Sequence, residues 1–144
     1  MSALLDEMRA LNATAAFNVW AGFEVTAAER GTAELRLPWR QEFGQYAGYL
    51  HAGLTTALID TACGFAVMTL GHGGSVLASH CAVDFLGPGR GTAFVARGRV
   101  VQSGRRQVFT FAELFAERDG DLTLIASGQT LLVPIPPPPS PGAA

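Results

Sequence analysis

The sequence predicts an α+β domain in which one long apolar helix lies against an antiparallel sheet. The helix is expected at about Gly53 to Leu70, where Asp60 is the one charged residue, and it ends at Gly71-His72-Gly73-Gly74. The chain after this point is rich in β-branched and aromatic residues and is divided by glycine-containing turns. A curved sheet of about five to six strands around a single helix would bury that helix on most sides, which agrees with its lack of charge.

The remaining elements follow from their boundary residues. Residues 2 to 16 are predicted to form a helix with Ser2 as the N-cap, and Glu29-Arg30-Gly31 is predicted to be the turn of a hairpin. Pro38 should close the second hairpin strand, because proline cannot donate to a ladder. The expected strands are 23–28, 32–37, 76–86, 92–103, 107–117 and 122–133.

Length and composition indicate one domain with more apolar surface than a monomer needs. The chain has 144 residues, and its 49% apolar against 15% charged content suggests that part of the surplus lies in a subunit interface. We expect residues 1–133 to form the domain. Residues 134–144, with six prolines, should be a disordered or polyproline tail, and it has no basic anchor that would suggest a docking motif.

Several classes of function are disfavoured. No run of apolar residues is long enough to span a membrane, and acids stand where a signal peptide carries basic residues, so we expect a cytoplasmic protein without a membrane partner. The net charge is −2 and the ten basic residues, all arginine, form no stripe, which argues against nucleic acid.

The histidines and cysteines predict neither a metal site nor a disulfide. His51, His72 and His80 are scattered, without the paired spacing of zinc ligands. Cys63 and Cys81 are expected to be two buried free thiols.

Asp60 is the first candidate for chemistry. On a helical wheel, Gly53, Thr56 and Gly64 fall within about 40° of it, while Leu58 and Phe65 fall on the far side, facing the sheet. A lone helical aspartate is usually solvated. Small neighbours on an otherwise uncharged helix instead indicate that a ligand or a second subunit approaches this carboxylate closely.

The start of the same helix is the second candidate. The first N–H groups of a helix lack internal partners and lie at the positive end of its dipole. The N–H groups near Ala52 and Gly53 are therefore suited to hold a polarised carbonyl oxygen. His51, just before them, is expected to be a structural hydrogen-bonding residue rather than a base.

The run Gln45, His51-Ala52-Gly53 and Asp60 resembles the hot-dog-fold acyl-CoA thioesterases. The branch is the phenylacetic acid degradation (PaaI-like) type, related to the hydroxybenzoyl-CoA thioesterases. In that pattern an Asn or Gln stands six positions before a His-Gly-Gly, and an acid stands nine positions after the His. The turns at 86–89 and 103–106 fit the same family, and the resemblance covers about residues 15 to 133.

The resemblance implies a hydrolase of acyl-CoA that needs no cofactor and no metal. Asp60 becomes the nucleophile or general base, the Ala52 N–H polarises the thioester carbonyl, and Gln45 comes from the partner subunit of a homodimer at least, or of a tetramer of paired dimers. Ala52 departs from the first glycine of the motif, and Ala78 falls where relatives often place Ser or Thr. The residues expected to bind substrate are Gly53, Ser79, Arg90, Arg105 and Arg106, the arginines through the CoA phosphates.

Two other functions stay open. A hydratase or dehydratase of the same fold would need an acid about four positions beyond Asp60, where Gly64 and Phe65 stand. A non-catalytic acyl-CoA-binding or sensing protein would account for Ala78. The acyl preference is also open, since the aromatic residues that could shape a pocket are equally suited to the core: Trp20, Phe23, Phe43, Tyr46 and Phe65.

Overall fold

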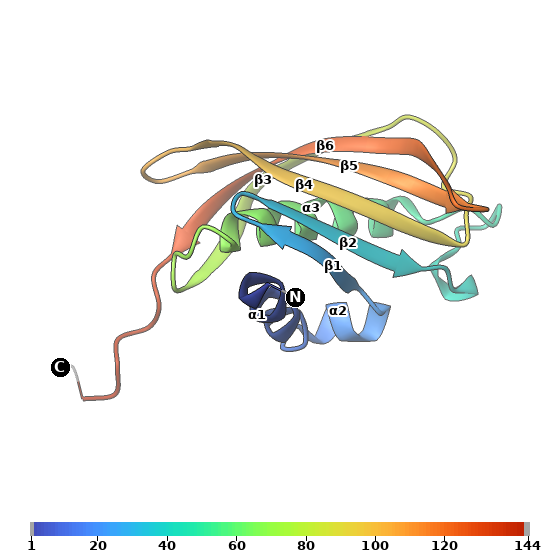
Figure 1. The fold of residues 1–144 in the computed structure, drawn as a ribbon. Coiled ribbons are helices and arrows are strands. Elements are labelled where there is room, and N and C mark those ends of the chain that lie inside the picture. Colours follow the sequence, from blue (N-terminus) through green and yellow to red (C-terminus); the bar gives the residue numbers. More distant parts are fainter. Residues whose placement is uncertain (1, 143–144) are drawn as a thin grey trace.

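The computed structural model, which describes residues 2–142, confirms the expected fold class. A six-stranded antiparallel sheet curves over the helix α3 (Ala52–Met68). In Figure 1 the last strands form the upper layer, α3 runs beneath them, and two N-terminal helices lie at the bottom. The structure is therefore one sheet wrapped around one central helix, with a short helical segment added on the outside.

The element bounds agree with the expected strands to within one or two residues. The helices are α1 (Ala3–Asn12), α2 (Ala16–Ala21) and α3, with a 3₁₀ turn η1 at Gln41–Phe43. The strands are β1 (Glu24–Glu29), β2 (Thr32–Pro38), β3 (Ser75–Phe85), β4 (Ala93–Ser103), β5 (Val108–Arg118) and β6 (Asp121–Ile135).

The strand order in the sheet is β1-β2-β4-β5-β6-β3. β3 follows α3 in the chain but pairs with the last strand, β6, and so it forms one edge of the sheet. The central helix lies against β2, β3, β4, β5 and β6. Because no strand within residues 2–142 pairs with the outer side of β3, most of its residues are exposed.

The core lies between the sheet and the inner side of α3. Leu58, Ile59 and Ala62 are fully buried on the helix, and they meet buried residues of the strands such as Leu35 and Leu114. Gly98 on β4 allows the closest approach, because a Cβ there would lie 2.5 Å from the carbonyl oxygen of Ala62. A glycine in β4 thus lets the sheet curve tightly over the middle of the helix.

The expected helix over residues 2 to 16 is correct up to Asn12 and wrong at residues 13–15, where the chain turns before α2. Ser2 caps α1 as predicted, accepting a hydrogen bond from the Leu5 N–H, but the helix ends at Asn12. The Thr14 hydroxyl donates to the Leu11 carbonyl oxygen at 2.7 Å and closes a turn, after which α2 begins. The side-chain bond competes with continued helix, a local effect that periodicity does not reveal.

Two further expectations differ from the structure. Cys81 is exposed on the edge strand β3, so only Cys63 is a buried thiol, and both are free. β6 continues to Ile135, which lies opposite Ser75, so the strand includes Pro134. Beyond β6 the described chain to residue 142 leads away from the body of the molecule (Figure 1), and residues 143–144 of the predicted tail lie outside the described part.

In the part of the chain that the structure describes, no helix has both the length and the apolar character needed to cross a bilayer.

Candidate functional site

Asp60 lies in the middle of α3 and borders a pocket of about 340 Å³. It is lined by residues of α3, of the first half of β3 and of β6, and by the end of α1, the start of α2 and the segment that connects them. A pocket of this volume is within the usual range for small-molecule sites. Its lining residues are Leu11, Thr14, Ala15, Asn18, Asp60, Thr61, Gly64, Phe65, Met68, Gly74, Ser75, Val76, Ala78 and Leu132.

The carboxylate of Asp60 lacks the partners that a buried acid normally has. Its Oδ1 atom is buried and accepts no hydrogen bond from residues 2–142. Burial raises the pKa of Asp60, because removal from water disfavours the charged form. An acid that is desolvated and unpaired at the edge of a pocket is costly for the fold and is typical of functional sites.

The start of α3 is arranged around His51. The His51 side chain caps the helix by accepting a hydrogen bond from the Gly53 N–H at its Nδ1 atom, at 2.8 Å. A Cβ on residue 53 would lie 3.0 Å from that same nitrogen, so glycine gives the ring room to fold back over the helix end. The His51 side chain is therefore the cap of α3 in this structure.

The Ala52 N–H is free for a ligand. Within residues 2–142 nothing accepts a hydrogen bond from it, whereas the next N–H groups bond to His51. Ala52 lies in the helix, and Asp119 is the one non-glycine residue of the described chain with positive φ. The change from the glycine of the family motif to alanine therefore keeps a backbone that an L-residue adopts without strain.

Gln45 lies in the loop before α3 and does not line the Asp60 pocket of its own chain. Its side-chain oxygen accepts hydrogen bonds from the N–H groups of Ala47 and Tyr49, and its backbone N–H donates to the Tyr49 carbonyl oxygen at 2.8 Å. The side-chain amide nitrogen donates no hydrogen bond within the described residues. The loop thus holds the side-chain oxygen of Gln45, and the side-chain NH₂ group of Gln45 is available to donate a hydrogen bond to a ligand.

The β3 wall of the pocket presents Ala78, and the neighbouring Ser79 is not part of the lining. The β3–β6 register shifts between Ala78 and His80, so Ser79 lies at an irregularity of the strand. Its hydroxyl donates to the Leu131 carbonyl oxygen at 3.3 Å. Sequence reasoning could not locate this irregularity, because it depends on the pairing with β6.

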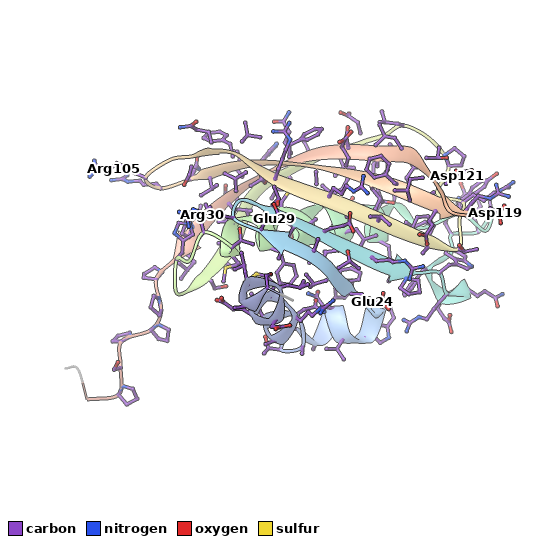
Figure 2. The ribbon with its side chains drawn as sticks, in the orientation of Figure 1. Glu24, Glu29, Arg30, Arg105, Asp119 and Asp121 are labelled. Atoms are coloured by element: carbon purple, nitrogen blue, oxygen red, sulfur yellow. The ribbon has the colours of Figure 1, made fainter. Side chains whose placement is uncertain are left out.

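The three candidate arginines lie at opposite ends of the sheet. Arg90 contacts Tyr49 near the start of α3, with 3.2 Å from its Nη2 to the phenol oxygen and its guanidinium over the ring. Arg105 projects from the β4–β5 turn at the end opposite to Asp119 (Figure 2), and Arg106 is its neighbour in that turn. The three arginines of one chain therefore do not form a single cluster of positive charge.

The aromatic residues are divided between core and surface. Trp20 and Phe43 pack edge to face with their ring centroids 6.0 Å apart, and Phe23 is buried. Tyr46 is fully exposed. Phe65, which the helical wheel placed toward the sheet, is the one aromatic residue that lines the Asp60 pocket.

The α1–α2 segment of the pocket was missed by sequence reasoning. Its residues Leu11, Thr14, Ala15 and Asn18 line the pocket. The available signal was Thr14, a residue that favours turns, inside a segment otherwise suited to a helix.

Other chemistry has little support at this site. Burial raises the pKa of the Cys63 thiol to about 11, so this neighbour of Asp60 on α3 is protonated at neutral pH and is a poor nucleophile. Among residues 2–142, no three His, Cys, Asp or Glu side chains are grouped so that they could hold a metal ion.

The central helix inside a curved antiparallel sheet, with an acid on its exposed face, defines a hot-dog domain. The chain belongs to the thioesterase superfamily: residues 47–123 match the model of that family. The matched region includes the capped start of α3, Asp60 and the strands from β3 to the beginning of β6.

Individual relatives agree with this membership. A thioesterase family protein from Silicibacter pomeroyi is 30% identical, with a TM-score of 0.85 over 90% of this chain and 96% of its own. A Saccharolobus solfataricus protein named "Putative esterase" is 29% identical over 73% of this chain and 74% of its own. The E. coli PaaI protein from the phenylacetic acid degradation operon has the same fold, with a TM-score of 0.82 over 92% of this chain and 93% of its own at 20% identity.

Proposed function

We propose that this protein hydrolyses the thioester of a small aryl- or acyl-CoA to the free acid and CoA, with Asp60 as the nucleophile or general base. The observation that carries the proposal is the buried, unpartnered Oδ1 atom of Asp60 at a pocket of about 340 Å³. Membership of the thioesterase superfamily agrees with this chemistry.

A thioester suits a site with one acid and few other catalytic groups. Water or the carboxylate adds to the carbonyl carbon, the C–S bond breaks, and the thiolate of CoA leaves and takes up a proton. A thiol has a pKa of about 8.5, by analogy with cysteine, so departure of the thiolate needs no strong general acid. Asp60 either removes the proton from the attacking water or attacks first and forms an anhydride that water then cleaves.

The Ala52 N–H is proposed to stabilise the developing oxyanion, with help from the α3 dipole. It is free of other partners and lies in the first turn of the helix. The amide NH₂ of Gln45, also free, would hold the water or the carbonyl oxygen.

These groups cannot serve one carbonyl from the same chain. Asp60 lies eight positions after Ala52, which is about 12 Å along the helix. One carbonyl that accepts from a donor and is attacked by a carboxylate, each at about 3 Å, brings the two groups within about 6 Å of one another. We therefore infer that Asp60 of one subunit works with Ala52 and Gln45 of a second.

The edge strand β3 supports a homodimer at least, in which the sheets join edge to edge, and a tetramer of paired dimers is the larger assembly we expect. β3 is an eleven-residue edge with exposed Leu77 and Phe85, an arrangement that soluble proteins usually cover. Light scattering that found a stable and active monomer would contradict the shared site. We further infer a cytoplasmic enzyme whose Pro-rich tail, residues 134–144, is not part of the catalytic domain, although residues 134 and 135 extend β6.

The direct test is thiol release from a panel of phenylacetyl-, hydroxybenzoyl-, short- and medium-chain acyl-CoA esters by the wild type and by Asp60→Asn. We expect turnover by the wild type and a loss of at least about a thousandfold in the variant, because asparagine can neither attack nor accept the proton. Circular dichroism controls for folding. Full activity in a folded Asp60→Asn protein would remove Asp60 from the mechanism.

A second candidate is a non-catalytic acyl-CoA-binding protein. The observation that favours it is the methyl group of Ala78 in the pocket wall, at a position where many relatives place a hydroxyl that orients water. This candidate predicts that CoA esters bind to the wild type and are not hydrolysed. The same panel, run with a binding measurement beside it, separates the two functions.

A further inference from the structure

The Asp60 pocket adjoins a second hollow beside the same helix. The second hollow, of about 390 Å³, shares four lining residues with the first, which are Leu11, Thr14, Met68 and Gly74. We call the two together the α1–α3 groove. It leads from Asp60, past the end of α1, to the Gly71–Gly74 segment after α3.

The groove runs beside one face of α3. Asp60, Gly64 and Met68 stand at intervals of four residues on one face of α3, and all three line it. This stretch is about 12 Å long. An extended alkyl chain rises about 1.3 Å per carbon, so about nine carbons separate the two ends.

The walls suit an uncharged alkyl chain. Asp60 is the one charged residue around the first hollow, at the end where a thioester would react. Two polar residues of the lining donate hydrogen bonds within the chain. The Thr14 hydroxyl donates to the Leu11 carbonyl oxygen, and the Asn18 side-chain amide donates to the Asn12 side-chain oxygen at 3.0 Å. Glu7 lines the second hollow, so an anionic group at the far end of a substrate would be repelled.

Gly64 keeps the groove open at its midpoint. A Cβ added there would meet nothing closer than a methyl carbon of Val76, at 3.9 Å. The helix backbone at this position needs no glycine, because Gly64 is not among the residues of positive φ. A Cβ is therefore accommodated at this position, and because Gly64 lines the groove, a larger side chain would occupy part of it.

The geometry points to a straight, uncharged acyl chain of about eight to ten carbons as the preferred substrate, with Gly64 as the residue that sets the accepted length. This inference rests on the proposed thioesterase function and sharpens its substrate class. A small aryl group would fill only the Asp60 end of the groove.

The test compares kcat/KM for butyryl-, hexanoyl-, octanoyl-, decanoyl- and phenylacetyl-CoA. In the wild type each added methylene should raise kcat/KM about two- to fourfold, levelling off near ten carbons, because each is buried in the groove. In Gly64→Leu the ratio of decanoyl to butyryl activity should fall at least about tenfold. Gly64→Ala, which favours helix, should give about a threefold decrease and serves if the leucine variant does not fold.

Gly87→Leu is the matched control, since a Cβ at Gly87 meets no atom within 4 Å and the residue lies outside the groove. Its ratio of decanoyl to butyryl activity should equal that of the wild type. Light scattering on every variant tests whether a second copy, rather than an acyl chain, covers the groove. A changed oligomeric state in Gly64→Leu with an unchanged activity ratio would overturn the inference.

Failure of the inference and failure of the proposed function look different. Turnover of the butyryl and phenylacetyl esters with no gain from longer chains would overturn the groove assignment and leave the thioesterase intact. If the wild type hydrolyses no ester, the proposed function fails, and the affinities of the acyl-CoA esters then test whether the groove binds an acyl chain. Decanoyl-CoA must then bind at least about tenfold tighter than butyryl-CoA, and Gly64→Leu must remove the difference; equal affinities would overturn the inference.

Discussion

The start and the middle of α3 hold the two halves of the proposed site in very different ways. At the start, His51 caps the helix and the surrounding loop bonds to itself, so the free Ala52 N–H is an ordinary consequence of a helix end. In the middle, Asp60 is partly buried with an unpartnered oxygen, which the helix does not require. The donor is therefore available at almost no cost in stability, whereas the acid destabilises the fold.

Among the changes that test this difference between the two halves of the site, removing the Ala52 N–H should have the largest effect on activity. Proline is well accepted at the first position of a helix, and His51, with φ −61° and ψ 136°, already has the conformation that a residue before proline needs. Ala52→Pro should therefore fold normally and lose about a hundred- to a thousandfold in kcat, because its missing N–H cannot hold the oxyanion. Steady-state kinetics with thermal unfolding as the control measure this.

Ala52→Gly is the matched variant for that experiment. It restores the residue of the family motif and retains the N–H, so its kcat should stay near that of the wild type. Equal activity in the proline and glycine variants would exclude the Ala52 N–H as the oxyanion donor.

The second effect concerns the protonation of Asp60. Burial raises the pKa of this carboxyl, and only its ionised form can attack or accept a proton. The value of kcat/KM should therefore fall about tenfold per pH unit on the acid side, with a midpoint above the ordinary aspartate value of about 3.9. A pH profile measured with a non-ionising acyl group tests this, and a midpoint at or below the ordinary value would show that desolvation does not control the acid.

A smaller effect, on KM, should show which end of the sheet binds the CoA phosphates. We expect Arg105→Ala combined with Arg106→Ala to raise KM for acyl-CoA about three- to tenfold while leaving kcat largely unchanged, since phosphate contacts remote from the carbonyl act on binding. Arg90→Ala, at the opposite end, is the comparison. An unchanged KM in the double variant would remove Arg105 and Arg106 from the substrate site.

The smallest effect is on stability. The folded-state pKa of Asp60 is raised, so the folded protein loses stability as the pH increases from the ordinary aspartate pKa through the raised value, and the loss is complete above it. Asp60→Asn should therefore raise the Tm by a few degrees at neutral pH. The difference should disappear below the ordinary aspartate pKa, and a lower Tm for the variant at neutral pH would show that the carboxylate has a stabilising partner in the assembled protein.

The sequence was sufficient for the parts of the structure that local signals determine. The strands after Gly74 and the limits of α3 were predicted closely because glycine turns and a charge-free segment mark them. The position of Asp60 on a face of small residues also followed from helix geometry.

What the sequence could not predict depends on contacts between distant segments. Part of the lining of the Asp60 pocket comes from the α1–α2 segment, where the chain makes a turn in which the Thr14 hydroxyl donates to the Leu11 carbonyl oxygen. Cys81 was expected to be a buried free thiol, and it is exposed on β3, a strand at the sheet edge. The lack of a hydrogen-bond partner for Asp60 Oδ1 within the described residues likewise depends on which distant segments pack around it.

The strand order has a consequence for how the protein is made. β3 cannot pair until β6 has been synthesised, since β6 is its one neighbour in the sheet, yet β3 supplies the Val76 and Ala78 wall of the pocket. A nascent chain on the ribosome therefore carries an unpaired apolar strand through the synthesis of β4 and β5. The pocket is completed only when almost the whole chain has emerged, so incomplete translation products have an unpaired β3 and lack the wall that it supplies to the pocket.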